Sequence, residues 1–267
     1  MFTDTHAHVY VEEFGNDLSE VLKRAGEAGV DHIFMPNIDS GSIPALHKVE
    51  ADYTFCTAMM GLHPCHVGEN FNEELKIVKE WLFGRRYAAV GEIGIDLYWD
   101  KTFVHEQEMA FRQQTEWALE LNLPIVIHSR ESLDMTISIV SEYVAKGISG
   151  VFHCFTGTRE QAFKIVDMGF FLGIGGVVTY KNSHLGEVLE DIPMKNIVLE
   201  TDSPYLPPVP YRGKRNEPSF IIEVAKKLSL IKKMEISEIG SITTNNAKNL
   251  FRHTSELIDK SSSEKRN

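Results

Sequence analysis

Six side chains that could bind metal ions stand where short apolar runs of this sequence end. They are four histidines and two carboxylates, namely His6, His8, Glu92, His128, His153 and Asp202. Neutral imidazole and carboxylate are common nitrogen and oxygen ligands of divalent ions in proteins. Burying so many polar groups together without partners would be costly, and bound cations would remove that cost. Since six ligands exceed one tetrahedral set, we predict two ions about 3.5–4 Å apart, bridged by a carboxylate.

The positions of these residues depend on an alternation of apolar runs and amphipathic stretches. We predict strands at residues 2–5, 32–37, 55–60, 88–93, 125–128, 151–155, 171–174 and 197–200. We predict helices at residues 17–28, 73–83, 105–121, 133–145, 160–168 and 185–190, and two more that begin near 218 and 236. Gly29 is expected to end the first helix, and Thr158 with Gln161 to form a capping box. Strands that alternate with helices imply a parallel sheet, and eight of them close into an α/β (β/α)8 TIM barrel with C-terminal helices.

This barrel would bring the six candidate ligands to one end. His6 and His8 close the first strand, where residues two apart point to the same face. The other four end, or closely follow, the fourth, fifth, sixth and eighth strands, at the face where TIM-barrel enzymes have their active sites. Each residue alone has a structural explanation: Glu92 could belong to a turn, and Asp202 could be a helix N-cap. Six such positions at one end of one barrel favour a functional site, whereas His32, at the start of its strand, is expected to be structural.

Composition limits the class of protein. The 267 residues suit one barrel domain over 1–259, followed by a flexible, Ser/Lys/Glu-rich tail over 260–267. Three cysteines without a close pair favour a reducing compartment. We find no membrane-spanning run, no signal peptide and no evident obligate protein partner, so we expect a cytoplasmic protein without membrane contact. The net charge of −11 argues against coating duplex DNA, so nucleic acid would bind at a local site where cations reverse the potential.

Six segments, taken in chain order, resemble the TatD-like metal-dependent deoxyribonucleases of the amidohydrolase-type barrels. They are DTHAH at 4–8, GLHP at 61–64, GEIGID at 91–96, PIVIHSR at 124–130, HCFTG at 153–157 and LETDSP at 199–204. Residues 215–218 are similar to the family's Asn-x-Pro segment. The resemblance covers nearly the whole chain, and the six segments together are far more specific than the first alone.

The resemblance implies a role for each ligand. One ion would be held by His6, His8 and Asp202, the other by His128 and His153, with Glu92 bridging the two. The ions would be Zn²⁺, Mn²⁺ or Mg²⁺, and histidine-rich ligation favours Zn²⁺ or Mn²⁺ over Mg²⁺. The sequence departs from the family at Cys65, where the family often has histidine. This departure leaves the roles of Cys65 and of the displaced His66 open.

The implied reaction is hydrolysis of phosphodiester bonds by a metal-activated water. We expect a deoxyribonuclease of the 3′–5′ exonuclease type that acts on DNA ends or single strands. Glu92 and Asp202 would be catalytic, and Asp202 would also orient the water or accept its proton. His63 would bind phosphate or protonate the leaving group.

Two further residues are predicted to bind substrate. Arg130 could hold a phosphate oxygen with its planar guanidinium, or it could instead form a surface ion pair with Glu131. Tyr98, with Trp99 beside it, could stack on a base, or both could pack within their loop.

Two other functions remain open at this point. One is an amidohydrolase, lactonase or phosphotriesterase that acts on a small molecule. Such barrels commonly carry a carboxylated lysine at the end of the fourth strand, and Glu92 at that position favours the nuclease. The other is a non-catalytic metal-binding protein, against which the full ligand set argues.

Overall fold

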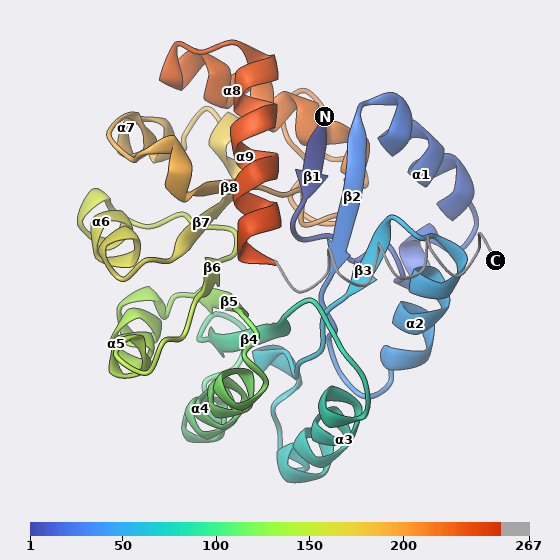
Figure 1. Cartoon of the computed structure of the whole chain (residues 1–267), viewed down its shortest axis with the longest axis vertical. Helices are drawn as coiled ribbons and strands as arrows, with labels where there is room; N and C mark the ends of the chain where they lie inside the picture. The colour runs from blue at the N-terminus through green and yellow to red at the C-terminus, as the bar shows by residue number, and fades with distance from the viewer. Residues whose placement is uncertain (252–267) are drawn as a thin grey trace, which may run out of the picture.

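Eight parallel strands form a closed ring in the computed structural model, which describes residues 1–251 (Figure 1). The strands are β1 (Phe2–Asp4), β2 (Val30–Met35), β3 (Cys56–Ala58), β4 (Val90–Asp96), β5 (Ile125–Arg130), β6 (Gly150–Phe152), β7 (Phe171–Ile174) and β8 (Ile197–Leu199). Strands β1 to β3 pair in one sheet, and β4 to β8 pair in a second. The predicted α/β barrel is confirmed.

Backbone hydrogen bonds join the two sheets at both of their edges. Between β8 and β1, the Thr5 N–H donates to the Leu199 carbonyl at 3.0 Å and the Asp202 N–H donates to the His6 carbonyl at 2.8 Å. Between β3 and β4, the Met60 N–H donates to the Ala89 carbonyl at 3.2 Å. The first edge therefore ties the segment that carries the first histidines to the segment that carries Asp202.

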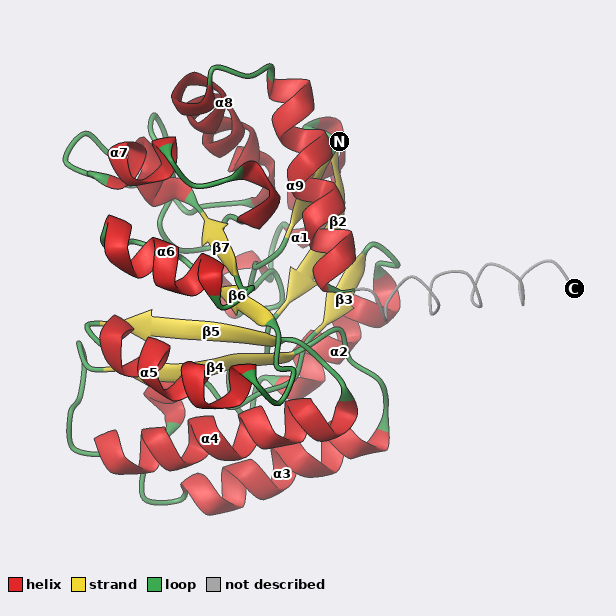
Figure 2. Ribbon diagram, turned by 60° about the vertical axis from the view of Figure 1, so that its left-hand side comes forward, coloured by secondary structure: helices red, strands yellow, loops and turns green. Residues whose placement is uncertain are grey.

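Helices cover the outside of the ring, as Figures 1 and 2 show from two directions. They are α1 (Leu18–Glu27), α2 (Ile43–Asp52), α3 (Phe71–Gly84), α4 (Val104–Leu121), α5 (Leu133–Val144), α6 (Arg159–Asp167), α7 (Leu185–Glu190), α8 (Ile221–Lys232) and α9 (Ile236–Leu250). Apolar side chains fill the space between strands and helices. Since β4 is buried along its whole length, a polar residue within it needs a partner.

Most of the predicted elements are present, with shifted ends. Gly29 follows α1 at a φ of +85°, and Thr158 and Gln161 form the predicted capping box of α6. Helix α2 was not predicted, because it buries only Ile43, Leu46 and Val49 between polar residues. Strand β4 ends at Asp96, three residues beyond the predicted end, since Gly94 continues the strand and does not turn the chain.

The last described helix, α9, packs against both β1 and β8. Gly240 of α9 allows this approach, because a Cβ there would lie 2.8 Å from the Met1 carbonyl oxygen. The tail predicted over 260–267 lies outside the described residues, and the single domain over 1–259 stays a prediction. No helix within residues 1–251 is both long and apolar enough to cross a membrane.

Candidate metal centre

The six predicted ligands gather at the C-terminal end of the barrel strands. Five of them line one cavity of about 680 Å³, and His6 is fully buried and does not line it. His6 and His8 follow β1, Glu92 lies within β4, His128 lies within β5, His153 follows β6 and Asp202 follows β8. Asp202 has a φ of +57° and caps no helix, so the structure does not bear out its explanation as an N-cap.

One group of possible ligands surrounds Oε2 of Glu92. This oxygen lies 3.1 Å from His6 Nε2 and 3.5 Å from His8 Nε2, and the two nitrogens are 3.2 Å apart. Asp202 Oδ1 lies 3.8 Å from each nitrogen. Ligands about 2.1 Å from a tetrahedral ion would be about 3.4 Å apart, and these separations fall close to that value.

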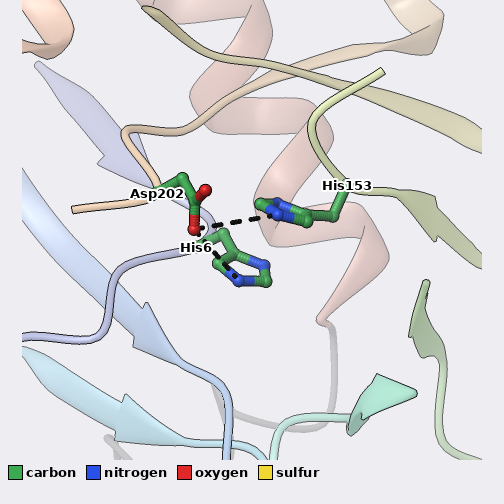
Figure 3. A group of neighbouring side chains, drawn as sticks. All are labelled: His6, His153 and Asp202. Atoms are coloured by element: carbon green, nitrogen blue, oxygen red, sulfur yellow. Dashed lines mark ion pairs between the residues drawn. The ribbon is translucent and has the colours of Figure 1, made fainter. Parts of the chain in front are cut away.

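Figure 3 shows how Asp202 faces this group. Its carboxylate points toward His6 and also toward His153, whose Nε2 lies 3.8 Å from Asp202 Oδ1. The His6 and His153 rings stack with their centroids 3.5 Å apart. Asp202 therefore stands between the two parts of the centre, beside ligands predicted for different ions.

A second group surrounds the other oxygen of Glu92. Oε1 lies 2.8 Å from His128 Nδ1, 3.5 Å from His63 Nε2 and 3.7 Å from His153 Nε2. The two oxygens of Glu92 thus face different sets of histidines, as a bridging carboxylate must. His63 was predicted to touch substrate and not metal, but it stands within this second group.

His63 is held in a tautomer that disfavours metal ligation. Its Nδ1 accepts a hydrogen bond from the Cys65 N–H at 3.1 Å, which places the ring proton of the neutral form on Nε2. Burial lowers the pKa of His63 to about 4, and this effect outweighs the attraction of Glu92. The neutral ring therefore presents an N–H donor to the cavity.

Three polar residues that the sequence analysis did not identify as functional contact the ligands. Tyr10 donates its hydroxyl hydrogen to the Pro36 carbonyl, so it accepts one from His8 Nδ1 at 3.1 Å. Asp96 Oδ2 lies 2.8 Å from His128 Nε2, and Glu200 Oε1 lies 2.9 Å from His153 Nδ1. Such partners fix the orientation and tautomer of metal-binding histidines.

The local electrostatics call for added positive charge. Burial raises the pKa of Asp202 to about 6. Burial alone would lower the pKa of His153, but Glu200 and Glu92 raise it to about 10, so the ring holds an extra proton that a bound ion would displace. Burial opposes ionisation of Glu92 too, yet the surrounding histidines hold its pKa well below the usual range.

No lysine or arginine within residues 1–251 forms an ion pair with any carboxylate of the centre. The carboxylates are Glu92, Asp96, Glu200 and Asp202, and their only ion-pair partners in that part of the chain are histidines. Buried carboxylates in such numbers need cations or protons beside them. The donor set, its spacing and this charge deficit all fit divalent ions.

Of the residues predicted to bind substrate, His63 and Arg130 line the cavity, whereas Tyr98 does not. Trp99 lines the cavity too. The Arg130 guanidinium lies 3.7 Å from the centre of the Tyr98 ring, and no ion pair joins it to Glu131, which pairs with Lys101 instead. Trp99 is 71% exposed, although its ring centroid lies 4.8 Å from that of Tyr98, so stacking on a base and packing within the loop both stay open.

Cys65 and His66, where the sequence departs from the family motif, lie close to the centre but outside its ligand groups. His66 pairs with Asp39, with 3.0 Å between Nδ1 and Oδ2. Cys65 is exposed on the cavity wall. Neither belongs to a group of possible ligands within the described chain, so the structure assigns them no metal.

Comparison with known proteins gives consistent matches. The model of a family described as "TatD related DNase" matches residues 3–252. The "uncharacterized metal-dependent hydrolase YabD" of Bacillus subtilis is 41% identical over 94% of this chain and 99% of its own length. The "3'-5' ssDNA/RNA exonuclease TatD" of Erwinia tasmaniensis is 32% identical over 90% of this chain and 95% of its own. The crystal structure of the TatD homologue YJJV from Escherichia coli superposes with a TM-score of 0.89 at 30% identity, covering 94% of this chain and 98% of that one.

Proposed function

The chain belongs to the TatD-related DNase family of metal-dependent hydrolases, and from this premise we propose that it hydrolyses phosphodiester bonds with two divalent ions. The observation that carries the proposal is the position of Glu92, whose two carboxylate oxygens face two different sets of histidines. A carboxylate placed in this way suits a pair of ions that act on one phosphate.

His6, His8 and Asp202 would hold one ion, and His128 and His153 the other. Bound divalent ions would supply Lewis-acid polarisation of a phosphoryl oxygen and lower the pKa of a water molecule. Asp202 Oδ1 lies 3.8 Å from the Nε2 atoms of both His6 and His153, so its carboxylate is placed to orient that water and accept its proton.

His63 would bind the substrate phosphate. Its neutral ring carries an N–H at Nε2, 3.5 Å from Glu92 Oε1 on the cavity wall, and this N–H could donate to a phosphoryl oxygen instead. With a pKa lowered to about 4, it carries little charge near neutral pH and is a weak source of a proton for the leaving group. Of its two predicted roles, the geometry supports phosphate binding.

We propose a 3′–5′ exonuclease that acts on single strands or on the ends of DNA. The Erwinia relative named for this activity on ssDNA and RNA supports the proposal. The net charge of −11 also disfavours a protein that covers long duplexes. Arg130 would hold a phosphate, and exposed Trp99 with Tyr98 would contact a base.

Metal analysis combined with nuclease assays tests the proposal. The purified protein should contain divalent ions and shorten a 5′-labelled single strand from its 3′ end, and chelation should stop the reaction. Glu92→Gln and Asp202→Asn should each lower kcat/KM by more than about a hundredfold. Glu131→Gln, which alters a carboxylate paired outside the centre, is the matched control.

Two results would count against the proposal. Full activity in both centre variants would show that the ligand groups are not catalytic. Equal cleavage of a closed duplex circle and a linear single strand would contradict an end-directed enzyme.

A further inference from the structure

A second arginine stacked on an aromatic ring belongs to loops that line the cavity of the candidate metal centre. The Arg212 guanidinium lies 3.9 Å from the centre of the Tyr180 ring. The Arg130 guanidinium lies 3.7 Å from the Tyr98 ring, so both arginines are held in the same manner. Neither Arg212 nor Tyr180 has a role in the proposed function.

Arg212 lies in the loop after β8 and Tyr180 in the loop after β7, and hydrogen bonds hold these two loops together beside the cavity. The Tyr180 hydroxyl donates to the Pro207 carbonyl, and the Val209 N–H donates to Thr179 Oγ1. Three residues of the same two loops line the metal cavity, namely Val177, Tyr205 and Leu206. These loops follow β7 and β8, whereas Arg130 ends β5, so the two pairs come from different strands of the barrel.

Both arginines are available to bind an anion. Five other arginines are paired with carboxylates: Arg24, Arg85, Arg112, Arg159 and Arg215. Neither Arg130 nor Arg212 has a carboxylate within ion-pair distance among residues 1–251. In a chain of net charge −11, a guanidinium that lines the cavity and a second on a loop that lines it are well placed to hold phosphates.

We infer that the mouth binds a single-stranded oligonucleotide across both pairs, with Arg130 and Arg212 each holding a backbone phosphate on the 5′ side of the scissile one. The inference rests on the proposed function and names its substrate class. A dinucleotide or a small phosphate ester has one phosphate and cannot reach the centre and both arginines together. Tyr205, 47% exposed, and Trp99, 71% exposed, offer ring faces to unpaired bases.

Substrate length provides the test. The Mn²⁺-loaded protein is given the dinucleotide dTpdT and the octamer (dT)8, and the ratio of their kcat/KM values is measured. Arg212→Ala should lower the octamer-to-dinucleotide ratio by about tenfold. The matched control is Lys146→Ala, which removes a cation held on the Tyr143 ring near the C-terminal end of α5, at the opposite end of the barrel. It should leave the ratio unchanged.

Binding supplies a readout that does not depend on turnover. Fluorescein-labelled (dT)8 is titrated with the ion-free protein in chelator, and anisotropy is followed at several salt concentrations. Arg212→Ala should weaken binding by about tenfold. It should also reduce the slope of log affinity against log salt by about 0.7, the value for one single-strand phosphate contact.

The outcomes separate the two proposals. If both substrates are cleaved and Arg212→Ala leaves the ratio and the salt slope as in the unmodified chain, the inference is wrong and the proposed function stands. If neither substrate is cleaved, the proposed function fails. In that case a weaker, less salt-dependent complex in Arg212→Ala still supports the oligonucleotide site, and an unchanged complex overturns it.

Discussion

Three candidate ligand histidines each have a partner on the ring nitrogen that faces away from the centre. Tyr10 serves His8, Asp96 serves His128 and Glu200 serves His153. The partner decides which nitrogen keeps a lone pair, and so it prepares the ring for an ion. These three residues are as much part of the candidate centre as the ligands themselves.

Tyr10→Phe tests this preparation at one residue. The change removes the acceptor of the His8 Nδ1–H, so His8 loses its preference for a lone pair at Nε2. We expect metal affinity, measured by competition with a coloured chelator, to fall about 10- to 100-fold. Tyr87→Phe is the matched control, because it breaks a 2.9 Å contact between a tyrosine and His47. An equal loss in both variants would remove any special role for Tyr10.

His32, outside the centre, should make the free energy of unfolding depend on pH. Burial lowers the pKa of His32 to about 4, and its Nε2 lies 2.9 Å from Thr57 Oγ1. Between its usual pKa of about 6.5 and this value, the unfolded chain binds a proton that the folded chain does not. The stability that His32 contributes is therefore complete above pH 6.5 and is lost as pH falls toward 4, by up to about 1.4 kcal/mol per unit.

The variant His32→Gln should reduce this loss. We expect urea unfolding between pH 7 and pH 5 to give a shallower fall in free energy than in the unmodified chain. His184→Gln, at a histidine whose side chain is 88% exposed, should leave the slope unchanged. Parallel slopes for all three proteins would show that another group causes the acid sensitivity.

The types of the candidate ligands could be predicted from the sequence, whereas the residues that orient their rings were missed although their spacing gave a signal. Tyr10 lies two residues from His8, Glu200 lies two residues from Asp202, and Asp96 lies four from Glu92. Strand periodicity places residues two and four apart on the same face, so the signal was present. It was not used for Asp96, because the predicted strand ended before Gly94.

At the scale of elements, the alternation of strands and helices could be predicted, because most strands are short runs of mainly apolar, buried residues. The missed helix α2 has few apolar residues and begins beside Pro44, so its packing against β3 decides its existence more than its sequence pattern does. The extension of β4 through Gly94 depends on contact with β5, which no pattern within the strand reveals.

Gly94 in β4 is the position in the strands and helices where glycine is needed most. It has a φ of +145°, and a Cβ there would lie 2.0 Å from the His128 carbonyl oxygen on β5. We expect Gly94→Ala to lower the free energy of unfolding by about 3 kcal/mol or more and to displace His128. The measurement is urea unfolding together with metal content.

Gly26 in α1 is the contrasting position. Nothing lies within 4 Å of a Cβ built there, and the residue is helical. Gly26→Ala should raise the free energy of unfolding by about 0.5–1 kcal/mol and leave the metal content unchanged. If both alanine variants shifted stability in the same direction, close packing at the β4–β5 contact would not be the cause.

At the scale of the whole molecule, metal binding by the carboxylates of the centre should raise the stability of the folded chain. An ion that binds only the folded chain stabilises it by about 2.7 kcal/mol at a hundred times its dissociation constant. We therefore expect the melting temperature to fall on chelation, to recover on return of Mn²⁺ or Zn²⁺, and to rise with the logarithm of ion concentration. Scanning calorimetry measures this, and Glu92→Gln should flatten the response. A melting temperature indifferent to chelation would contradict the coupling.

The hydrogen bonds between the segments of β1 and β8 have a consequence for how the protein folds during its synthesis on the ribosome. His6 and His8 leave the ribosome 196 and 194 residues before Asp202, an interval of roughly 10 to 40 s at about 5–20 residues per second. During that time the nascent chain offers an ion only part of its ligands, and β1 lacks the neighbour that Thr5 later bonds. Loading with metal should therefore be a late event that follows completion of the ring and locks the first strand of the chain to the last.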